Sequence, residues 1–503
     1  MKSRYLLYIC VALLAVTACE VEPVMVGYRE QYVQRAEVME RVSVDEERHV
    51  LLLYSVGFNN LSRYLREDIQ DLWDGWLPGE GRQDDVLLIY SHAPKADGDY
   101  ATPNSPVLYK LYRGADDSVV SDTLVVYDEN ARSATAEQLN AVLAYVNETY
   151  PAKSYGMVFS SHATGYLPAG YYSSPTDFTF DWGISYRFGH RDSSPKPVPY
   201  VEQWRDPSLP AVKSIGQDLV GPYGSRVSYE IELSDFAAAI PMHMEYILFD
   251  ACLMGGVEVA YELKDKCDYI GFSPTEVLSE GFNYKTLTSN LLGEDRSLRA
   301  VCEDYYNQYI DKTGASRSAT ISLVDCSGMD ALAECCAGLF RKYRTGLDLI
   351  SPVRVQQYYT YSYHWFYDLE SIISESGRAE RYHLESSKSN LQKQIDKAVA
   401  SEDQAALEEL EPQFAEVDAR LQEIMLTWDE HLAELTADIQ ELRKALTGCI
   451  VYKAATPEFL IGPGGFRIYA YSGLSMYLPC NGGENLDKYY KTLGWNISTG
   501  LVK

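Results

Sequence analysis

A histidine and a cysteine each follow an apolar run of this chain, and together these residue types could perform nucleophilic catalysis. His162 comes shortly after the run Met157–Phe159, and Cys252 comes shortly after Tyr246–Phe249. A thiol attacks a carbonyl carbon efficiently only as the thiolate, and a nearby imidazole can accept its proton. His162 and Cys252 are therefore the candidate base and nucleophile, provided that the fold brings them together.

Short apolar runs predict strands, and the stretches between them, where apolar residues recur at helical spacing, predict helices. These elements would bring His162 and Cys252 together. The predicted strands are residues 50–54, 86–90, 123–127, 156–160 and 246–249. Between the first two strands, and again between the third and fourth, apolar residues recur every three or four positions, with Asn60 and Thr135 as candidate helix N-caps. This alternation predicts an α/β fold with a mostly parallel central sheet. Functional residues of such sheets lie beyond the carboxyl ends of the strands, where His162 and Cys252 both fall.

The remainder of the chain is less regular. Residues 269–272, 319–324, 466–471 and 474–478 are further strand candidates. Residues 171–229 carry many Ser, Pro, Gly and Tyr residues and several basic ones, without sustained periodicity. A stretch of this length is too long for an ordinary connection, so it is interpreted as a functional loop or an insertion.

A long amphipathic pattern covers residues from about 384 to 446. Leucines and other apolar residues step by three and four among Glu, Gln, Asp and Lys, which predicts a helix or helical hairpin with breaks near Ser401–Asp403 and at Pro412. The hairpin could pack on the rest of the chain or form a coiled coil with a partner, and the first interpretation is favoured.

The N-terminus has the features of an export signal. Lys2 and Arg4 precede an apolar stretch too short to span a bilayer, and Val16–Ala18 lead directly to Cys19. This resembles the lipobox of bacterial lipoproteins, in which the cysteine is lipidated. The expected organisation is a signal peptide over residues 1–19 and a tether over 20–48. We therefore expect the protein to be attached to the outer membrane by a lipid anchor and to face the periplasm or the cell surface.

Charge and cysteine spacing exclude other classes of function. The formal net charge is −28, with no lysine/arginine cluster, which argues against a nucleic-acid partner. The cysteines beyond Cys19 have no paired metal-ligand spacing, and the sequence leaves open which of them form disulfides.

Several blocks of the chain resemble the clostripain-like cysteine peptidases of the caspase-fold clan. The strongest is Phe249–Met254, and others are residues 51–54 with 59–61, 257–263, 273–276, 280–284, 365–369 and 472–479. The resemblance implies a caspase-like (caspase/hemoglobinase) α/β fold with a mostly parallel sheet flanked by helices. The catalytic core would cover residues 49–290, with the long loop at 171–229 inserted. Residues 291–503 would pack on this core and carry the helical hairpin.

The resemblance also implies roles for particular residues. Cys252 would be the nucleophile and His162 the general acid/base of a dyad that cleaves peptide bonds through an acyl-enzyme. The backbone amides of Cys252 and Ala163 would bind the oxyanion. The family usually has glycine at the position of Ala163, so an alanine there serves only if the backbone does not need a positive φ.

Substrate choice, processing and cofactors are further implications of the resemblance. Members of the clostripain type prefer Arg or Lys before the scissile bond, and Asp250 and Glu280 match their acidic pocket residues, with Glu276 as the fallback. Clan members are often activated by cleavage between the histidine and cysteine blocks, for which residues 171–229 offer basic sites. No cofactor is required, and calcium, associated with clostripain itself, is left open with no residues assigned.

Two functions from different classes follow. The first is a lipid-anchored cysteine endopeptidase that cleaves after basic residues by the Cys252/His162 dyad. The alternative is a catalytically weak or inactive surface lipoprotein that keeps the fold and uses the helical segment and tyrosine-rich loops as interaction surfaces. The intact Cys252 and His162 favour the peptidase.

Overall fold

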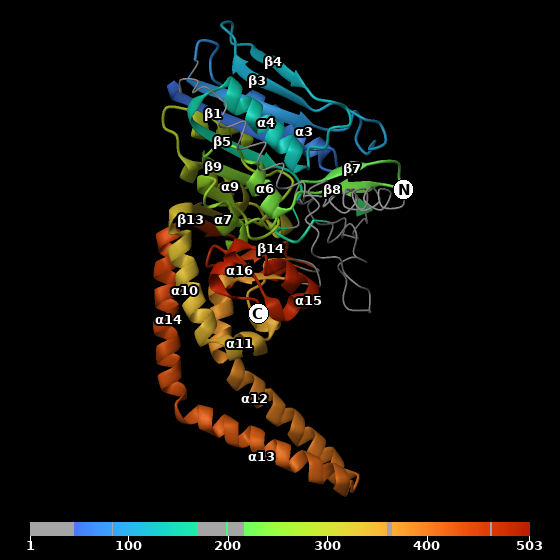
Figure 1. Ribbon diagram of the computed structural model, residues 1–503, viewed down its shortest axis with the longest axis vertical. Coiled ribbons are helices and arrows are strands. Elements are labelled where there is room, and N and C mark those ends of the chain that lie inside the picture. The colour runs from blue at the N-terminus through green and yellow to red at the C-terminus, as the bar shows by residue number, and fades with distance from the viewer. Residues whose placement is uncertain are drawn as a thin grey trace, which may run out of the picture.

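A nine-stranded mixed sheet organises the chain in a computed structural model (Figure 1). The structure describes residues 45–82, 84–163, 165–169, 198–199, 216–359, 365–462 and 465–503. The expected signal peptide, Cys19, nearly all of the tether and most of the 171–229 segment lie outside the described residues. The first strand begins at Asp45, inside the stretch expected to be tether.

The strand order in the sheet is β13-β11-β10-β9-β5-β1-β2-β3-β4. Its five middle strands run parallel, namely β10 (Cys267–Phe272), β9 (Met244–Asp250), β5 (Ala152–Ser160), β1 (Asp45–Val56) and β2 (Asp85–His92). Their apolar side chains are buried on both faces and form the centre of the hydrophobic core. Continuous apolar runs in the sequence are the signature of such doubly covered strands, and the α/β prediction is confirmed.

The outer strands are antiparallel, and the sequence prediction was incomplete there. On one side lie β3 (Val107–Arg113) and β4 (Val119–Val126), and on the other β11 (Thr320–Asp325) and β13 (Ile450–Ala455). β3 and β13 were not predicted because their apolar residues are interrupted by charged or polar ones, as in antiparallel strands with one solvated face. Since β11 and β13 join the same sheet, the region after residue 290 completes the core sheet as well as packing on it.

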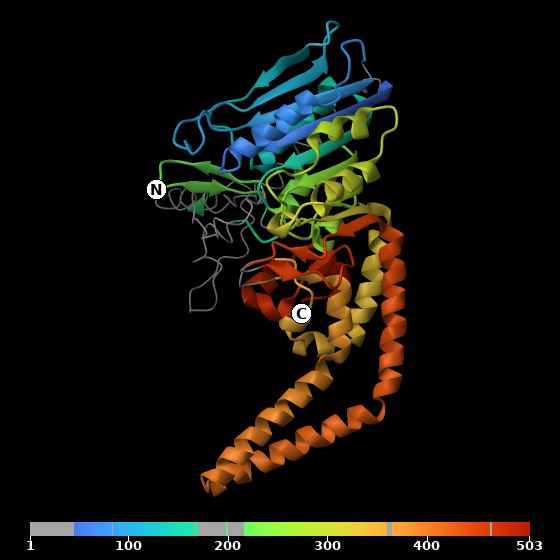
Figure 2. The ribbon, with the colours of Figure 1, turned by 180° about the vertical axis from the view of Figure 1, so that it is seen from behind.

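Helices cover both faces of the sheet (Figures 1 and 2). The shorter helices, of which α11 and α15 lie beyond the sheet, are in chain order α3 (Ser62–Asp74), α4 (Ala136–Thr149), α6 (Leu233–Ala239), α7 (Val257–Leu263), α8 (Tyr284–Leu292), α9 (Leu298–Ile310), α10 (Met329–Lys342), α11 (Arg344–Leu349), α15 (Pro479–Tyr490) and α16 (Gly494–Thr499). The predicted cap of α4 is confirmed, because the Thr135 hydroxyl accepts the Gln138 amide at 3.2 Å. Asn60 does not cap α3, whose N-cap is Leu61.

Smaller elements complete the fold. Short 3₁₀ turns are η1 (Gly314–Ser316), η2 (Cys326–Gly328) and η3 (Pro352–Arg354). Three small antiparallel sheets are built from β6 (Val198–Pro199), β7 (Asp218–Val220) and β8 (Val227–Tyr229), from β12 (Phe366–Asp368) and β16 (Ser475–Tyr477), and from β14 (Glu458–Phe459) and β15 (Phe466–Arg467). The strand expected over 466–471 therefore ends after two residues.

Three long helices follow one another from residue 369. They are α12 (Leu369–Ala400), α13 (Gln404–Leu426) and α14 (Trp428–Cys449). α14 buries a stripe that includes Leu435 and Leu442, whereas α13 has no buried residue. Figure 2 shows α12 and α13 side by side, projecting away from the sheet.

The favoured interpretation, a hairpin packed on the core, was therefore wrong for α13. Its apolar stripe is only half-buried, mainly against α12. The expected break at Pro412 was also wrong, because Pro412 lies inside α13, and the chain bends at Thr427 instead. A proline removes one backbone hydrogen bond, and this solvated helix continues past it. Within the described residues, no helix has both the length and the apolar composition needed to cross a membrane.

Candidate active site

Register places His162 and Cys252 at equivalent positions of neighbouring strands. β5 and β9 pair in parallel with Ser160 opposite Asp250, the last residue of each strand. Both chains then continue for two residues, to His162 and to Cys252 respectively. The Ser161 amide still donates to the Asp250 carbonyl at 3.4 Å. His162 and Cys252 thus follow adjacent strand ends at the same edge of the sheet, where the strand-end rule predicted them.

The thiol of Cys252 is buried, with 1% of the residue exposed, and it contacts the main chain of Val277. The Val277 amide donates to the sulfur at 3.1 Å, and the sulfur lies 3.6 Å from the Val277 carbonyl oxygen. The segment after β10 therefore covers the sulfur of Cys252, the candidate nucleophile.

The residue after the nucleophile has an unusual backbone conformation. Leu253 has a φ of +60°, in the left-handed region that branched side chains avoid. Such a residue costs on the order of 1–3 kcal/mol and persists only where neighbouring contacts hold it. The Leu253 amide donates to the Thr275 carbonyl at 2.8 Å, and the Gly255 amide donates to Ser273 at 2.8 Å. These contacts fix the sharp turn from which Cys252 projects.

The backbone of Ala163 does not have a positive φ, which was the condition for an alanine to serve as an oxyanion donor. It is buried, and it is not among the described non-glycine residues with positive φ. An alanine therefore adopts this backbone without strain, and its N–H is retained. The glycine that the family usually carries at this position is not required by the conformation seen here.

Asp250 lies fully buried beneath the turn at Gly281. Its carboxylate accepts hydrogen bonds from the Tyr284 hydroxyl at 2.6 Å and the Ser160 hydroxyl at 3.2 Å. Burial, and next the charge of Asp250, raise the pKa of Tyr284 well above its usual range, so this hydroxyl stays a donor. Gly281 has a φ of +56°, and a Cβ there would lie 2.3 Å from an Asp250 oxygen, so only glycine fits.

The other two acidic candidates differ in exposure. Glu280 is at the surface, with 61% of its side chain exposed, and forms an ion pair with Lys312. The ammonium of Lys312 also lies 4.6 Å from the centre of the Tyr309 ring. Glu276 is buried, with 2% exposed. The structure thus brings Asp250 and the backbone of Glu280 to one turn, while the Glu280 side chain faces solvent.

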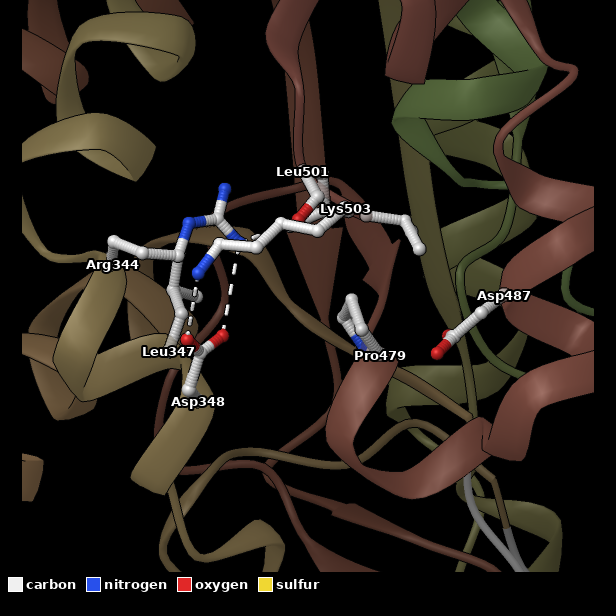
Figure 3. A pocket seen from close by; sticks show the side chains of 8 residues that line it. Arg344, Leu347, Asp348, Pro479, Asp487, Leu501 and Lys503 are labelled. Atoms are coloured by element: carbon white, nitrogen blue, oxygen red, sulfur yellow. Dashed lines mark hydrogen bonds and ion pairs between the residues drawn. The ribbon is translucent and has the colours of Figure 1, made fainter.

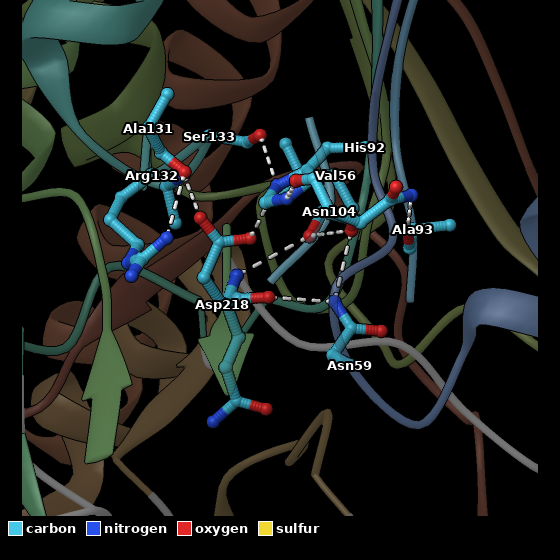
Figure 4. Close-up of polar contacts among 12 residues, drawn as sticks. Val56, Asn59, His92, Ala93, Asn104, Ala131, Arg132, Ser133 and Asp218 are labelled. Carbon is cyan, nitrogen blue, oxygen red and sulfur yellow. Dashed lines mark hydrogen bonds and ion pairs between the residues drawn. The ribbon is translucent and has the colours of Figure 1, made fainter. Parts of the chain in front are cut away.

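A second polar cluster lies beside the site, under the end of β7 (Figure 4). The buried His92 ring contacts the Ser133 hydroxyl at 2.7 Å and Asp218 at 3.5 Å, and Asp218 also accepts the Ala134 amide at 3.0 Å. Serine, histidine and aspartate together suggest a hydrolase triad, but all three are buried within the core, at 1% exposure or less. Their role is to attach β7 to the sheet.

A surface cavity lies far along the chain from these residues (Figure 3). It has a volume of about 230 Å³ and is lined by residues of α11, α15 and the C-terminal segment. Its charged groups pair with one another: Lys503 contacts Asp348 at 3.0 Å, and Arg344 donates to the Leu501 carbonyl at 2.8 Å. This cavity contains no candidate nucleophile or base.

The part of the chain that the structure describes contains no assembled metal site. Among the described residues, no group of three or more His, Cys, Asp or Glu side chains is arranged to hold a metal ion.

Glu258, on the helix that follows Cys252, predicts a pH dependence of stability. Its buried carboxyl accepts the Tyr477 amide at 2.9 Å, and burial raises its pKa to about 7, from an ordinary 4.5. Between these values the unfolded chain loses the proton that the folded chain keeps, so stability falls as pH rises from about 4.5 to about 7. Glu258→Gln removes this dependence, worth on the order of 2 kcal/mol.

The measurement is urea unfolding of wild type and Glu258→Gln at pH 5 and pH 8. We expect wild type to lose stability relative to the variant at pH 8. Glu294→Gln, at a side chain that is 86% exposed, serves as the matched control. A constant difference between wild type and Glu258→Gln at both pH values would contradict the assignment.

The sequence matches a known protein family, and the fold is similar to solved structures. A family model described as the clostripain family matches residues 53–186 and 202–417, well over half of the chain. The fold is similar to an inactive zymogen C11 protease from Parabacteroides distasonis, with 24% identity, a TM-score of 0.60, and coverage of 90% of this chain and 97% of that one.

A second solved structure is similar to the same extent. It is a secreted C11 cysteine protease from Bacteroides thetaiotaomicron in complex with an irreversible peptide inhibitor, with 20% identity and a TM-score of 0.59. The comparison covers 90% of this chain and 99% of that one. No curated protein matches the chain in sequence.

These findings define the class of protein first: it is a cysteine peptidase with a caspase-like fold. More specifically, the chain belongs to the clostripain family. Peptidases of this family need no cofactor in general. The alternative of a non-enzymatic binding protein is not supported.

Sequence reasoning missed three residues that contact the candidate site residues His162, Cys252 and Asp250. Asn60, treated as a helix cap, contacts His162, and Val277 contacts Cys252 through its main chain. Tyr284 donates to Asp250. Asn60 follows the end of β1, next to β5, so the strand-end rule could have identified it. A main-chain contact such as that of Val277 leaves no signal in residue type.

Proposed function

We propose that the protein is an endopeptidase that cleaves after arginine or lysine by a Cys252/His162 dyad. The observation that carries the proposal is the matched register of β5 and β9, which projects the two side chains from adjacent strand ends. Each chain continues two residues beyond the Ser160–Asp250 pair, so imidazole and thiol arise from equivalent positions.

The chemistry follows in two steps. His162 takes the proton of Cys252, and the thiolate attacks the peptide carbonyl to form a tetrahedral oxyanion, which the amides of Cys252 and Ala163 stabilise. His162 then protonates the departing amine, leaving an acyl-enzyme. Water, activated by His162, hydrolyses this thioester and regenerates the thiol.

Access to the thiol requires a local movement. An attacked carbonyl carbon must come within about 3–3.5 Å of the sulfur, and Cys252 is 1% exposed beneath Val277. The segment that covers it, which begins after β10, must therefore shift when substrate binds or when the enzyme is activated. Glu280 and Gly281 lie at the end of this same segment, so the movement would also open the way toward Asp250.

The preference for basic residues is inferred from the two acidic groups beside this segment. Asp250 supplies a buried carboxylate beneath the Gly281 turn. Glu280 supplies an exposed one, and its ion pair with Lys312 shows that this carboxylate binds a cation. A substrate guanidinium or ammonium can replace Lys312 there with a charge-assisted hydrogen bond.

A panel of fluorogenic peptides with Arg, Lys, Ala or Asp before the scissile bond tests the specificity. We expect cleavage of the Arg and Lys peptides only. Glu280→Ala should lower kcat/KM for both by about tenfold, as expected for one exposed charge-assisted contact, and Glu280→Asp should lower it less.

Lys312→Ala is the matched control, since it removes the ion pair but keeps the carboxylate. We expect it to retain cleavage of Arg and Lys peptides in full. If Glu280→Ala and Lys312→Ala lower cleavage equally for all peptides, Glu280 stabilises the surface and takes no part in specificity. Cleavage of the Ala peptide as fast as the Arg peptide by wild type would overturn the proposed preference.

A further inference from the structure

A third strand end contributes to the site beside those that carry His162 and Cys252. β1 lies next to β5 in the sheet, with Ser55 opposite Ser160. Asn60 follows the end of β1, and its side-chain oxygen, Oδ1, contacts Nε2 of the His162 ring. The two residues are 102 positions apart in sequence. The contact is therefore created by the fold, from the strand on the side of β5 opposite to β9.

The preceding residue, Asn59, holds the turn that presents Asn60. Asn59 is fully buried, and its amide nitrogen donates to the Val56 carbonyl at 2.9 Å and to the Gln217 carbonyl at 2.7 Å (Figure 4). Its amide oxygen accepts the Leu61 N–H at 2.9 Å. Adjacent asparagines thus have different tasks: Asn59 fixes the backbone, and the side chain of Asn60 extends to the catalytic histidine.

A shared acceptor joins the two segments. The Val56 carbonyl also accepts the Ser161 hydroxyl, at 3.0 Å, and Ser161 directly precedes His162. The neighbours of Asn60 and of His162 are therefore attached to one carbonyl at the end of β1. This common attachment fixes the position of Asn60 relative to the imidazole.

We propose that Asn60 is a positioning residue for His162, which it holds in the tautomer and orientation that serve the Cys252 thiol. With Oδ1 of Asn60 as the acceptor, the proposal assigns a proton to Nε2 of His162. In the neutral ring Nδ1 is then the basic nitrogen, and it is the atom that exchanges the proton with sulfur and with the leaving amine. This proposal rests on the proposed role of His162 as general acid/base.

The test compares Asn60→Ala and Asn60→Asp with wild type and His162→Ala on an Arg peptide across pH. Asn60→Ala should lower kcat by about 10- to 100-fold with KM nearly unchanged, since the base is misplaced while the substrate contacts persist. Asn60→Asp keeps an acceptor and adds a negative charge. It should restore part of kcat and move the pH limb that reports ionisation of His162 upward by about one unit.

Gln70→Ala, on the exposed face of α3, is the control for substitution in this region and should behave as wild type. A purely structural role of Asn60 predicts a lower melting temperature with the pH limb unmoved. That result, or full activity in Asn60→Ala with His162→Ala inactive, would overturn the role of Asn60 and leave the dyad standing. Full activity in His162→Ala would instead overturn the dyad itself.

Discussion

Replacing Cys252 with alanine is expected to abolish peptide cleavage, with a loss of kcat of about 10⁴-fold or more, while the chain remains folded. The attacking atom is removed and no other group can form the acyl-enzyme. His162→Ala should lose nearly as much, because thiolate formation and leaving-group protonation both depend on it. Since the two residues act as a unit, the double variant should be no slower than Cys252→Ala alone.

A second buried cysteine provides the control. Cys302 is fully buried, and burial raises the pKa of its thiol to about 12, so it has little thiolate character. Cys302→Ala should retain the wild-type kcat, measured with the same Arg peptide. If Cys252→Ala retained more than about one per cent of the wild-type kcat, the assignment of Cys252 as the nucleophile would be contradicted.

Replacing Asp250 with asparagine is the second large effect that we expect. The substitution keeps the shape of the side chain but removes the carboxylate beneath Gly281. Charged hydrogen bonds are worth about 1.5–3 kcal/mol, so kcat/KM for Arg and Lys peptides should fall by about 10- to 100-fold. Cleavage of neutral peptides should be unchanged or slightly better, which separates a loss of specificity from a loss of catalysis.

Tyr284→Phe is the matched control for this experiment. It removes the 2.6 Å hydrogen bond to Asp250 but leaves the carboxylate in place. We expect it to lower the free energy of unfolding by about 1 kcal/mol and to keep the preference for basic residues. If Asp250→Asn and Tyr284→Phe lose stability equally and neither changes the ratio of Arg to Ala cleavage, Asp250 is a structural residue only.

The parallel strands in the middle of the sheet could be predicted from the sequence, whereas of the outer strands β11 and part of β4 were predicted and β3 and β13 were not. Doubly buried parallel strands have nearly continuous apolar sequences, which identified β1, β2, β5 and β9 and placed His162 and Cys252 at their ends. The apolar residues of β3 and β13 are interrupted by charged or polar ones, so their runs resemble loops. Their place in the sheet depends on partners distant in sequence.

The helical region shows a different limit of sequence reasoning. The same apolar periodicity runs through α13 and α14, yet α14 buries part of its apolar face against the core, whereas α13 packs mainly on α12 and has no buried residue. Periodicity identifies an apolar face but does not say how much of it is covered.

The site shows a similar division. The types of His162, Cys252 and Asp250 identified the chemistry because thiol, imidazole and carboxylate are chemically distinctive. Asn60 could serve equally as a helix cap or as a partner of a histidine, and only the adjacency of β1 and β5 decides between them.

Covalent labelling tests the central claim, that Cys252 is the nucleophile of a peptidase with specificity for basic residues. A lysyl peptide chloromethyl ketone would alkylate the attacking thiolate, forming a thioether and releasing chloride, and mass spectrometry of the digested protein locates the adduct. We expect one adduct, on the fragment that contains Cys252, absent in Cys252→Ala and slower to form in His162→Ala. An adduct on any other cysteine, or labelling of Cys252→Ala to the same extent as wild type, would contradict the assignment.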